Sequence, residues 1–105
     1  MKVIVINSCL RELKTFPEEV RGDFLDAVSD LESGINLEMP LSRKMAGMGT
    51  GVYELRLKDK DGIFRVIYFI KKTDAIYIIH AFQKKSQKTP LRNVKLALQR
   101  IRSIK

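Results

Sequence analysis

The sequence predicts one α+β domain, with helices packed on one face of a mostly antiparallel sheet. Two segments, 18–35 and 91–104, carry apolar residues at helical spacing, whereas 52–58, 63–70 and 75–82 have the pattern of strands. A chain of 105 residues with 45% apolar residues is the size of a single folded unit, so residues 1–105 are expected to form one domain. The predicted element order is β-α-α-β-β-β-β-α.

The N-terminal part is expected to hold one strand and two helices. Residues 2–6 are a β-branched run typical of a strand covered on both faces, and a short helix follows through Lys14. Thr15 and Glu18 have the spacing of a capping box, with Pro17 favouring the first turn of a longer helix. A stop follows at Ser33-Gly34, and the opposite helix face is acidic. The residues predicted to face the core are Val20, Phe24, Ala27, Val28, Leu31 and Ile35.

The remaining strands are expected to form a meander. Residues 35–51 contain Pro and Gly and are predicted to be a loop with a short strand around 43–46. Residues 52–58 alternate between apolar and polar, the segment 59–62 forms a hairpin turn, and 63–70 and 75–82 complete the sheet. After a basic loop at 83–88, Thr89 and Pro90 are predicted to cap the last helix. The residues expected to face inward are Leu91, Val94, Ala97, Leu98, Ile101 and Ile104.

Charge is distributed unevenly along the chain. The formal net charge is +8, and residues 1–70 contain ten basic and eleven acidic side chains. Residues 71–105 contain ten basic side chains and a single acidic one, Asp74. Such a field attracts polyanions, so RNA, DNA or an acidic protein are the predicted partners.

Several classes of protein are excluded by composition. No apolar run approaches the roughly 20 residues that cross a bilayer, and the amino end lacks the features of a signal peptide, so no membrane association is expected. Cys9 and His80 are the only residues of their types, too few for a Cys/His zinc site or an internal disulfide. No cofactor motif is present, and a cytoplasmic location is expected.

Arg65 and Arg56 are the first candidate site residues. Arg65 interrupts an otherwise apolar strand, where an unpaired guanidinium would be costly. It therefore either binds an anion or forms an ion pair with Glu54 or Asp61. Arg56 lies on the polar face of the neighbouring strand, and two arginines on one sheet face can bind a phosphate through paired donors.

The end of the last strand supplies the other candidates. Lys84, Lys85 and Lys88 crowd the loop that follows it, either as phosphate ligands or as an ordinary solvated loop. His80 lies near the strand's end, where a histidine can act as an acid or base or can be hydrogen-bonded in a core.

Three segments together are similar to a known family: Val52-Tyr53-Glu54-Leu55-Arg56, Phe64-Arg65-Val66-Ile67-Tyr68, and the tail from His80 to Pro90 that ends in Gln87-Lys88-Thr89-Pro90. The chain resembles the RelE superfamily of bacterial toxins, in particular its phage-related, HigB-like branch. The resemblance implies a RelE-like α+β fold and a toxin of a type II toxin–antitoxin system. It further implies metal-independent cleavage of messenger RNA on the ribosome, without a cofactor, and a HigA-like helix-turn-helix antitoxin as partner.

By the same resemblance, Arg65 and Arg56 would bind the scissile phosphate. Lys84 and Lys85 would contact phosphate or move a proton, and His80 would be an additional acid or base. Further RNA contacts are expected from Lys58, Lys88 and Arg92. A ParE-like inhibitor of DNA gyrase with the same fold is the main alternative, and a basic binding module without toxicity is a third.

Overall fold

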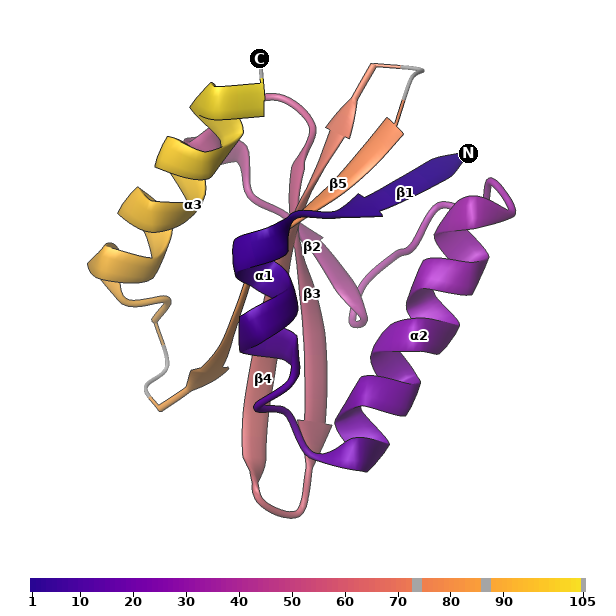
Figure 1. The fold of residues 1–105 in the computed structure, drawn as a ribbon, viewed down its shortest axis with the longest axis vertical. Coiled ribbons are helices and arrows are strands. Elements are labelled where there is room, and N and C mark those ends of the chain that lie inside the picture. Colours follow the sequence, from indigo (N-terminus) through magenta and orange to yellow (C-terminus); the bar gives the residue numbers. More distant parts are fainter. Residues whose placement is uncertain (73–74, 86–87, 105) are drawn as a thin grey trace.

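The backbone forms a five-stranded sheet between helices in the computed structural model, which describes residues 1–72, 75–85 and 88–104. The strands are Lys2–Val5 (β1), Ser42–Lys44 (β2), Val52–Asp59 (β3), Gly62–Lys71 (β4) and Ala75–Lys84 (β5). Their order across the sheet is β1-β5-β4-β3-β2 (Figure 1). The β1–β5 pair is parallel and the other pairs are antiparallel, which confirms the predicted α+β class.

Helices cover both faces of this sheet. Helices α1 (Asn7–Leu13) and α2 (Glu18–Glu32) pack on one face, and α3 (Leu91–Ile104) packs on the other (Figure 1). The prediction that all helices share one face was therefore wrong. The physical reason lies in β4, where apolar residues occupy both alternating sets of positions, so that both faces of the strand need cover.

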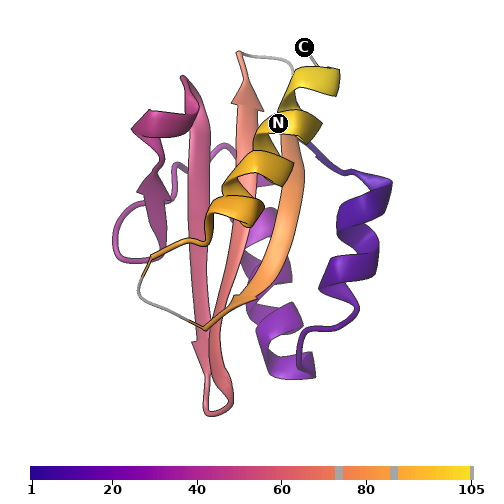
Figure 2. The ribbon, with the colours of Figure 1, turned by 90° about the vertical axis from the view of Figure 1, so that its left-hand side faces the viewer.

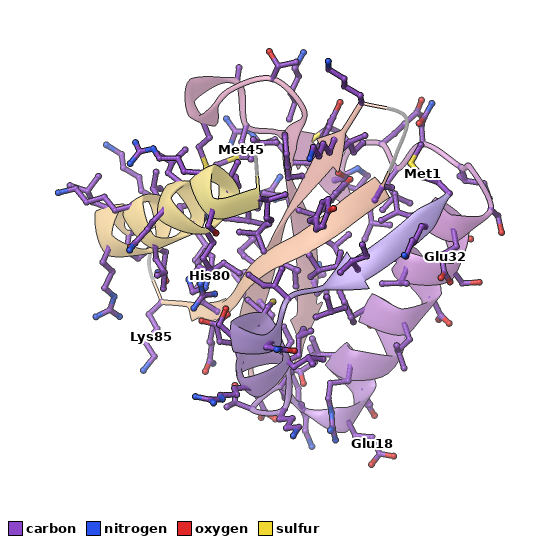
Figure 3. All side chains as sticks on the ribbon, turned by 45° about the horizontal axis from the view of Figure 1, so that its top comes forward. Met1, Glu18, Glu32, Met45, His80 and Lys85 are labelled. Carbon is purple, nitrogen blue, oxygen red and sulfur yellow. The ribbon has the colours of Figure 1, made fainter. Side chains whose placement is uncertain are left out.

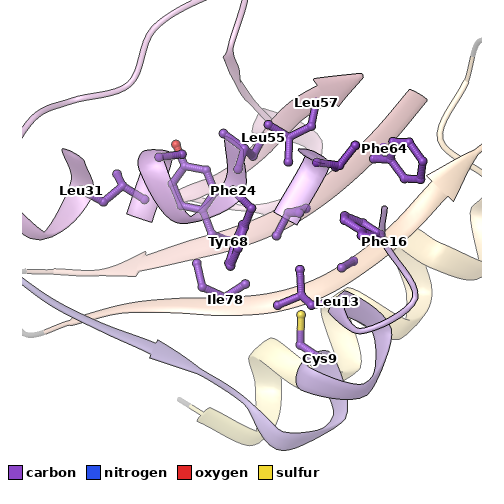
Figure 4. Close-up of a cluster of buried hydrophobic side chains, with 14 of the residues drawn as sticks. Cys9, Leu13, Phe16, Phe24, Leu31, Leu55, Leu57, Phe64, Tyr68 and Ile78 are labelled. Carbon is purple, nitrogen blue, oxygen red and sulfur yellow. The ribbon is translucent and has the colours of Figure 1, made fainter. Parts of the chain in front are cut away.

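Two apolar cores result. The larger one fills the space between the sheet and the α1–α2 pair, and Figure 4 shows its aromatic rings and aliphatic side chains meeting there. Cys9 is fully buried within it, and burial is the main reason that the pKa of its thiol is raised to about 12. The smaller core lies under α3 and consists of Val52, Ile67, Phe69, Ile79, Ala97 and Ile101.

The predicted helix starts need correction. The helix α2 begins at Glu18 with Pro17 at its N-cap, and no side chain caps it. Thr15 instead donates a hydrogen bond to the Glu12 carbonyl oxygen at 2.7 Å, so there is no capping box. Ile35 and Leu91, both expected in the core, are 52% and 65% exposed: Ile35 lies beyond the end of α2, and Leu91 is the first residue of α3.

Strand β5 continues to Lys84, two residues beyond its predicted end. Its register with β4 shifts between Ile67 and Tyr68: Ile67 pairs with His80, whereas Tyr68 pairs with Ile78. The extra residue, Ile79, forms a bulge, and both Ile79 and His80 face α3. Beyond the bulge, Phe82 and Lys84 lie on that same face of the sheet.

Gly51 precedes β3 and cannot be replaced without strain. Its φ is +82°, and a Cβ atom there would lie 2.6 Å from the carbonyl oxygen of Ile70. We expect Gly51→Ala to reduce the free energy of unfolding by about 1–3 kcal/mol. The matched control is Gly22→Ala in α2, where a Cβ would meet nothing within 4 Å, and where alanine should stabilise the helix by roughly 0.5–1 kcal/mol. Urea denaturation of both variants checks this, and similar effects at the two positions would contradict it.

Candidate nucleic-acid interface

The cations of the candidate site lie on the sheet face that α3 only partly covers. Arg56 is directly opposite Arg65 in the β3–β4 pair, and Ile63 of β4 is opposite Lys84 of β5. Residues that are directly opposite project to the same face. Arg43 of β2 joins them because it is opposite Glu54. Figure 2 shows that the β3–β4 hairpin extends beyond α3, which leaves this end of the face open.

Arg65 is buried, with only 5% of its surface exposed. Its Nε lies 3.5 Å from Glu54 Oε1, and its Nη1 donates to the Phe64 carbonyl oxygen at 3.1 Å. The expected alternative of an ion pair is thus confirmed with Glu54 rather than Asp61. The Nε–H nevertheless has no hydrogen-bond partner among the described residues, because the ion pair is too long and poorly aligned. A buried N–H of this kind can donate a hydrogen bond to a ligand oxygen at little further desolvation cost.

The pKa of Arg65 is lowered from its ordinary value, mainly by burial. The charge of Glu54 opposes this shift, and the charge of Arg56 adds to it. Arg65 is therefore a cation whose charge is only partly compensated by its neighbours. An approaching phosphate would relieve this imbalance.

Glu54 links the site to the segment before α3. Its carboxylate is 97% buried, and its Oε2 accepts a hydrogen bond from Thr89 Oγ1 at 2.9 Å. Thr89 was expected to cap α3, but its hydroxyl is directed to the sheet instead. The consequence is that the basic segment leading into α3 is anchored beside Arg65.

Two pockets open along this face. One, of about 380 Å³, is lined by Arg56, Lys58 and Arg65 over an apolar floor that includes Leu41 and Ile63. The other, of about 510 Å³, is lined by both polar and apolar residues. Its charged and hydroxyl residues are Arg43, Lys44, Glu54, Lys84, Lys88 and Thr89. Both pockets therefore present cations, with one carboxylate at the second.

Lys84 is half-buried within this group of cations. Its pKa is lowered, first by burial and then by the charge of Arg65. Glu54 acts in the opposite direction, and Arg56 and Arg43 lower the pKa further. A lysine of this kind gives up its proton more readily than an exposed one, which suits it to proton transfer.

The other predicted contact residues lie around this group. Lys58 is exposed at the first pocket, and Lys88 lines the second. Lys85 points outward from the end of β5 and lines neither of these pockets (Figure 3). Arg92 is exposed in the first turn of α3, also outside them.

His80 lies in a cluster that joins α1 to α3 and that includes neither Arg56 nor Arg65. Its Nε2 is 2.6 Å from Asn93 Oδ1, and its Nδ1 is 2.9 Å from Glu12 Oε2. Arg100 Nη1 donates to Glu12 Oε1 at 2.9 Å and to the Ile79 carbonyl oxygen at 3.0 Å. Both ring nitrogens of His80 therefore already have protein partners, and the ring is 3% exposed (Figure 3).

Glu12 is the centre of this cluster. Burial alone would raise its pKa, but hydrogen bonds with His80, Arg100 and the Ala81 N–H, together with the charge of His80, outweigh burial. The pKa is lowered to about 2. The Ala81 N–H donates to Oε1 at 3.1 Å, at the point where β1 has ended and the β5 edge would otherwise lack an acceptor.

Sequence reasoning missed Arg43, Glu12, Asn93 and Arg100. Arg43 lies in a three-residue strand that is too short for an alternation pattern. Asn93 and Arg100 are seven residues apart in α3, so they lie on one helical face, and this spacing was the available signal. Glu12 had no signal, because its partners lie 68 or more residues away in the chain.

Within residues 1–72, 75–85 and 88–104, no three His, Cys, Asp or Glu side chains are grouped as metal ligands would be. No helix in the same part of the chain has the length and apolar character needed to span a membrane.

Comparison with known proteins is consistent with this geometry. The model of a family described as "Phage derived protein Gp49-like (DUF891)" matches residues 11–102. No curated protein matches the chain. Among solved structures, the chain is similar to a variant of Escherichia coli toxin RelE in the free state, in which two arginines are replaced by alanine. The TM-score is 0.70 at 20% identity, over 95% of this chain and 96% of that one.

Proposed function

Because the chain belongs to the Gp49-like family of phage-derived proteins and has the fold of the RelE toxin, we propose that it is the toxin of a type II toxin–antitoxin system. We propose further that it is a metal-independent ribonuclease that cuts messenger RNA on the ribosome and so inhibits translation. The observation that carries this proposal is the set of Arg56, Arg65 and Lys84 on one open sheet face. The partner protein is then a HigA-like antitoxin, and the site of action is the cytoplasm.

The proposed reaction is an attack of the ribose 2′-hydroxyl on the adjacent phosphate. Arg65 and Arg56 bind the phosphate and stabilise the charge that develops in the transition state. Lys84, with its lowered pKa, donates a proton to the leaving 5′-oxygen. Glu54 is the only carboxylate among the residues lining the two pockets, and it is the group there that can accept the proton of the 2′-hydroxyl.

Other proposed roles are assigned by position. Lys58 and Lys88 lie at the pockets and would bind flanking phosphates. Lys85 and Arg92 are exposed outside the pockets and would contact RNA further from the cut. His80 would contribute through its contact with Asn93. Asn93 lines neither pocket, but it lies four residues after Thr89, which lines the second one.

Expression of the chain without its antitoxin is expected to stop growth by blocking translation. The reason is that the cations Arg56, Arg65 and Lys84 on one open sheet face suit phosphate binding and RNA cleavage. Pulse labelling of protein and DNA after induction measures both processes. If DNA synthesis collapsed first while translation continued, the ParE-like alternative would replace this proposal, and if neither changed, the chain would be a binding module.

The cut messenger is expected to carry a 2′,3′-cyclic phosphate and a 5′-hydroxyl. These ends follow from attack by the 2′-oxygen of the RNA itself rather than by water. Enzymatic end-labelling of fragments cut on purified ribosomes distinguishes them. Fragments with 5′-phosphates would show that water is the nucleophile and would rule the mechanism out.

A further inference from the structure

The strand β1 forms one edge of the sheet. It pairs with β5 alone, in parallel, so within residues 1–72, 75–85 and 88–104 its outer side has no neighbouring strand. Figure 3 shows β1 as the last strand of the sheet, with Met1 at its start near Glu32 at the end of α2. The backbone on the outer side of β1 is therefore available to another chain.

The outward backbone groups of β1 belong to Val3 and Val5. The Ile6 N–H donates to the Ile78 carbonyl oxygen at 3.2 Å, so it points toward β5. Because backbone groups alternate between the two sides of a strand, the N–H and C=O of Ile4 also point toward β5. Those of Val3 and Val5 then point outward, where the described part of the chain offers them no hydrogen-bond partner.

Neighbouring parts of the sheet edges are protected, whereas β1 is not. Where β1 ends, the Glu12 carboxylate accepts the Ala81 N–H at 3.1 Å and so occupies the edge of β5. The opposite edge strand, β2, contains Arg43 and Lys44, and charged residues on an edge discourage pairing with another chain. Residues 3–5 of β1 are all apolar and only partly buried. An open apolar edge of this kind favours association.

We propose that a second copy of the chain pairs with this edge through its own β1, antiparallel to the first. The two-fold axis passes through Ile4, so that Val3 of one copy is opposite Val5 of the other and Ile4 is opposite its own equivalent. Val3 and Val5, whose backbone groups point outward, then form hydrogen-bonded pairs that each exchange two bonds. Ile4 forms the closer, non-hydrogen-bonded pair at the axis. One sheet thus runs through both copies.

The two ends of β1 carry complementary groups. At its start, Met1 is exposed, and its amine donates to the Glu32 carbonyl oxygen at 2.6 Å, so the acidic end of α2 lies here. At its other end α1 begins, with the exposed residues Leu10 and Arg11. A two-fold pair sets the start of one β1 beside the end of the other. Leu10 of one copy is then near Met1 of the other, and Arg11 is near Glu32, so a second copy matches this edge in apolar character and in charge.

Pairing through β1 leaves the candidate site uncovered. The strands β5 and β4 lie between β1 and β3, which carries Arg56. Lys84 is on β5, but β1 pairs only with residues 75–78 at the opposite end of that strand. The cation faces of the two copies would therefore lie toward opposite ends of the shared sheet. A dimer of this kind would form whether or not the chain cleaves RNA.

A cysteine at the two-fold axis tests both the pairing and its register. Ile4→Cys in the full chain should form a disulfide-linked dimer with oxidised glutathione, because Cα atoms of a non-hydrogen-bonded pair lie about 4.5 Å apart. Lys2→Cys is the matched control: it is more exposed and on the same face, but its two copies would be roughly 14 Å apart. Cys9 is fully buried and should not react. On a non-reducing gel, equal cross-linking of both variants, or none of Ile4→Cys, would overturn the proposal.

Opposite charges at Ile4 give a second test, read by light scattering. The native chain should change from one-chain to two-chain mass over about a hundredfold range of concentration, as should Leu25→Lys, a control on the exposed side of α2. Ile4→Lys and Ile4→Glu should each stay single, because like charges meet at the axis, whereas their mixture should pair. A mixture of folded variants that stays single would overturn the proposal. If thermal melting shows either variant unfolded, the cysteine variants decide.

Discussion

Arg65→Ala is expected to abolish growth arrest and to destabilise the fold at the same time. Loss of the phosphate ligand should lower the cleavage rate by about 10²–10³. Removal of the guanidinium also leaves the carboxylate of Glu54 buried, with Thr89 as its remaining hydrogen-bond partner, and breaking a buried pair in this way costs about 3–5 kcal/mol. Thermal melting and ribosome cleavage assays of the purified variant measure both effects.

A second variant tests whether the activity of Arg65→Ala is lost only because the fold is destabilised. In Glu54→Gln with Arg65→Ala the stranded charge is gone, so much of the lost stability should return. Cleavage should stay lost, because the phosphate ligand Arg65 and the proposed proton acceptor Glu54 are both missing. If activity returned together with stability, neither Arg65 nor Glu54 would take part in the reaction, and the loss of activity in Arg65→Ala would follow from its loss of stability.

Glu12→Gln is expected to cost about 3 kcal/mol of stability at neutral pH, because its pKa near 2 lies about 2.5 below its ordinary value. The variant loses the charge that His80 and Arg100 share, although the amide retains an oxygen for the Ala81 N–H. The matched control is Glu18→Gln, at an exposed position in the first turn of α2. Urea denaturation at pH 7 compares the free energies of unfolding of the two variants. If both lost little stability, and equally, Glu12 would not stabilise the fold more than an exposed glutamate does.

The pH dependence of this difference has a definite sign. The pKa of Glu12 is lowered in the folded chain, so its contribution is fully present above the unfolded value of about 4.5 and is lost as the pH falls toward 2. The difference in stability between the native chain and Glu12→Gln should therefore be constant from pH 7 to pH 5. It should shrink steadily between pH 4.5 and pH 2. A difference that stayed constant to pH 2 would show that folding does not lower the pKa of Glu12.

The sequence was sufficient for the order of elements because each strand and helix has its own local period. It was insufficient for the layer arrangement. Residues 63–70 are apolar on both faces, and this two-sided burial was the sign that helices lie on both sides of the sheet. Capping was also misjudged, because Thr15 and Thr89 found other acceptors once the chain was folded.

The candidate site was predictable where it depends on local structure, as the order of elements was. Arg56 and Arg65 were placed together because a tight hairpin fixes their register, and that pairing is confirmed. Lys84 was assigned to a loop, so its position on the cation face was not foreseen. Glu54 was foreseen only as a possible partner of Arg65. Its bond to Thr89 joins residues 35 positions apart, and no local pattern reports such a contact.

The bulge at Ile79 gives the site an unusual sensitivity to chain length. In a β5 of the same length but without the bulge, Lys84 would fall opposite Gly62 instead of Ile63 and would project toward α2, away from Arg65. Deleting one residue of the bulge would restore regular pairing and leave Lys84 opposite Ile63. Deleting one residue of 81–83, with the bulge kept, would instead place Lys84 opposite Phe64 and turn its side chain toward α2, whereas substitutions along the same stretch would leave its direction unchanged. Residues 81–84 of β5 are therefore expected to tolerate substitutions far better than an insertion or a deletion.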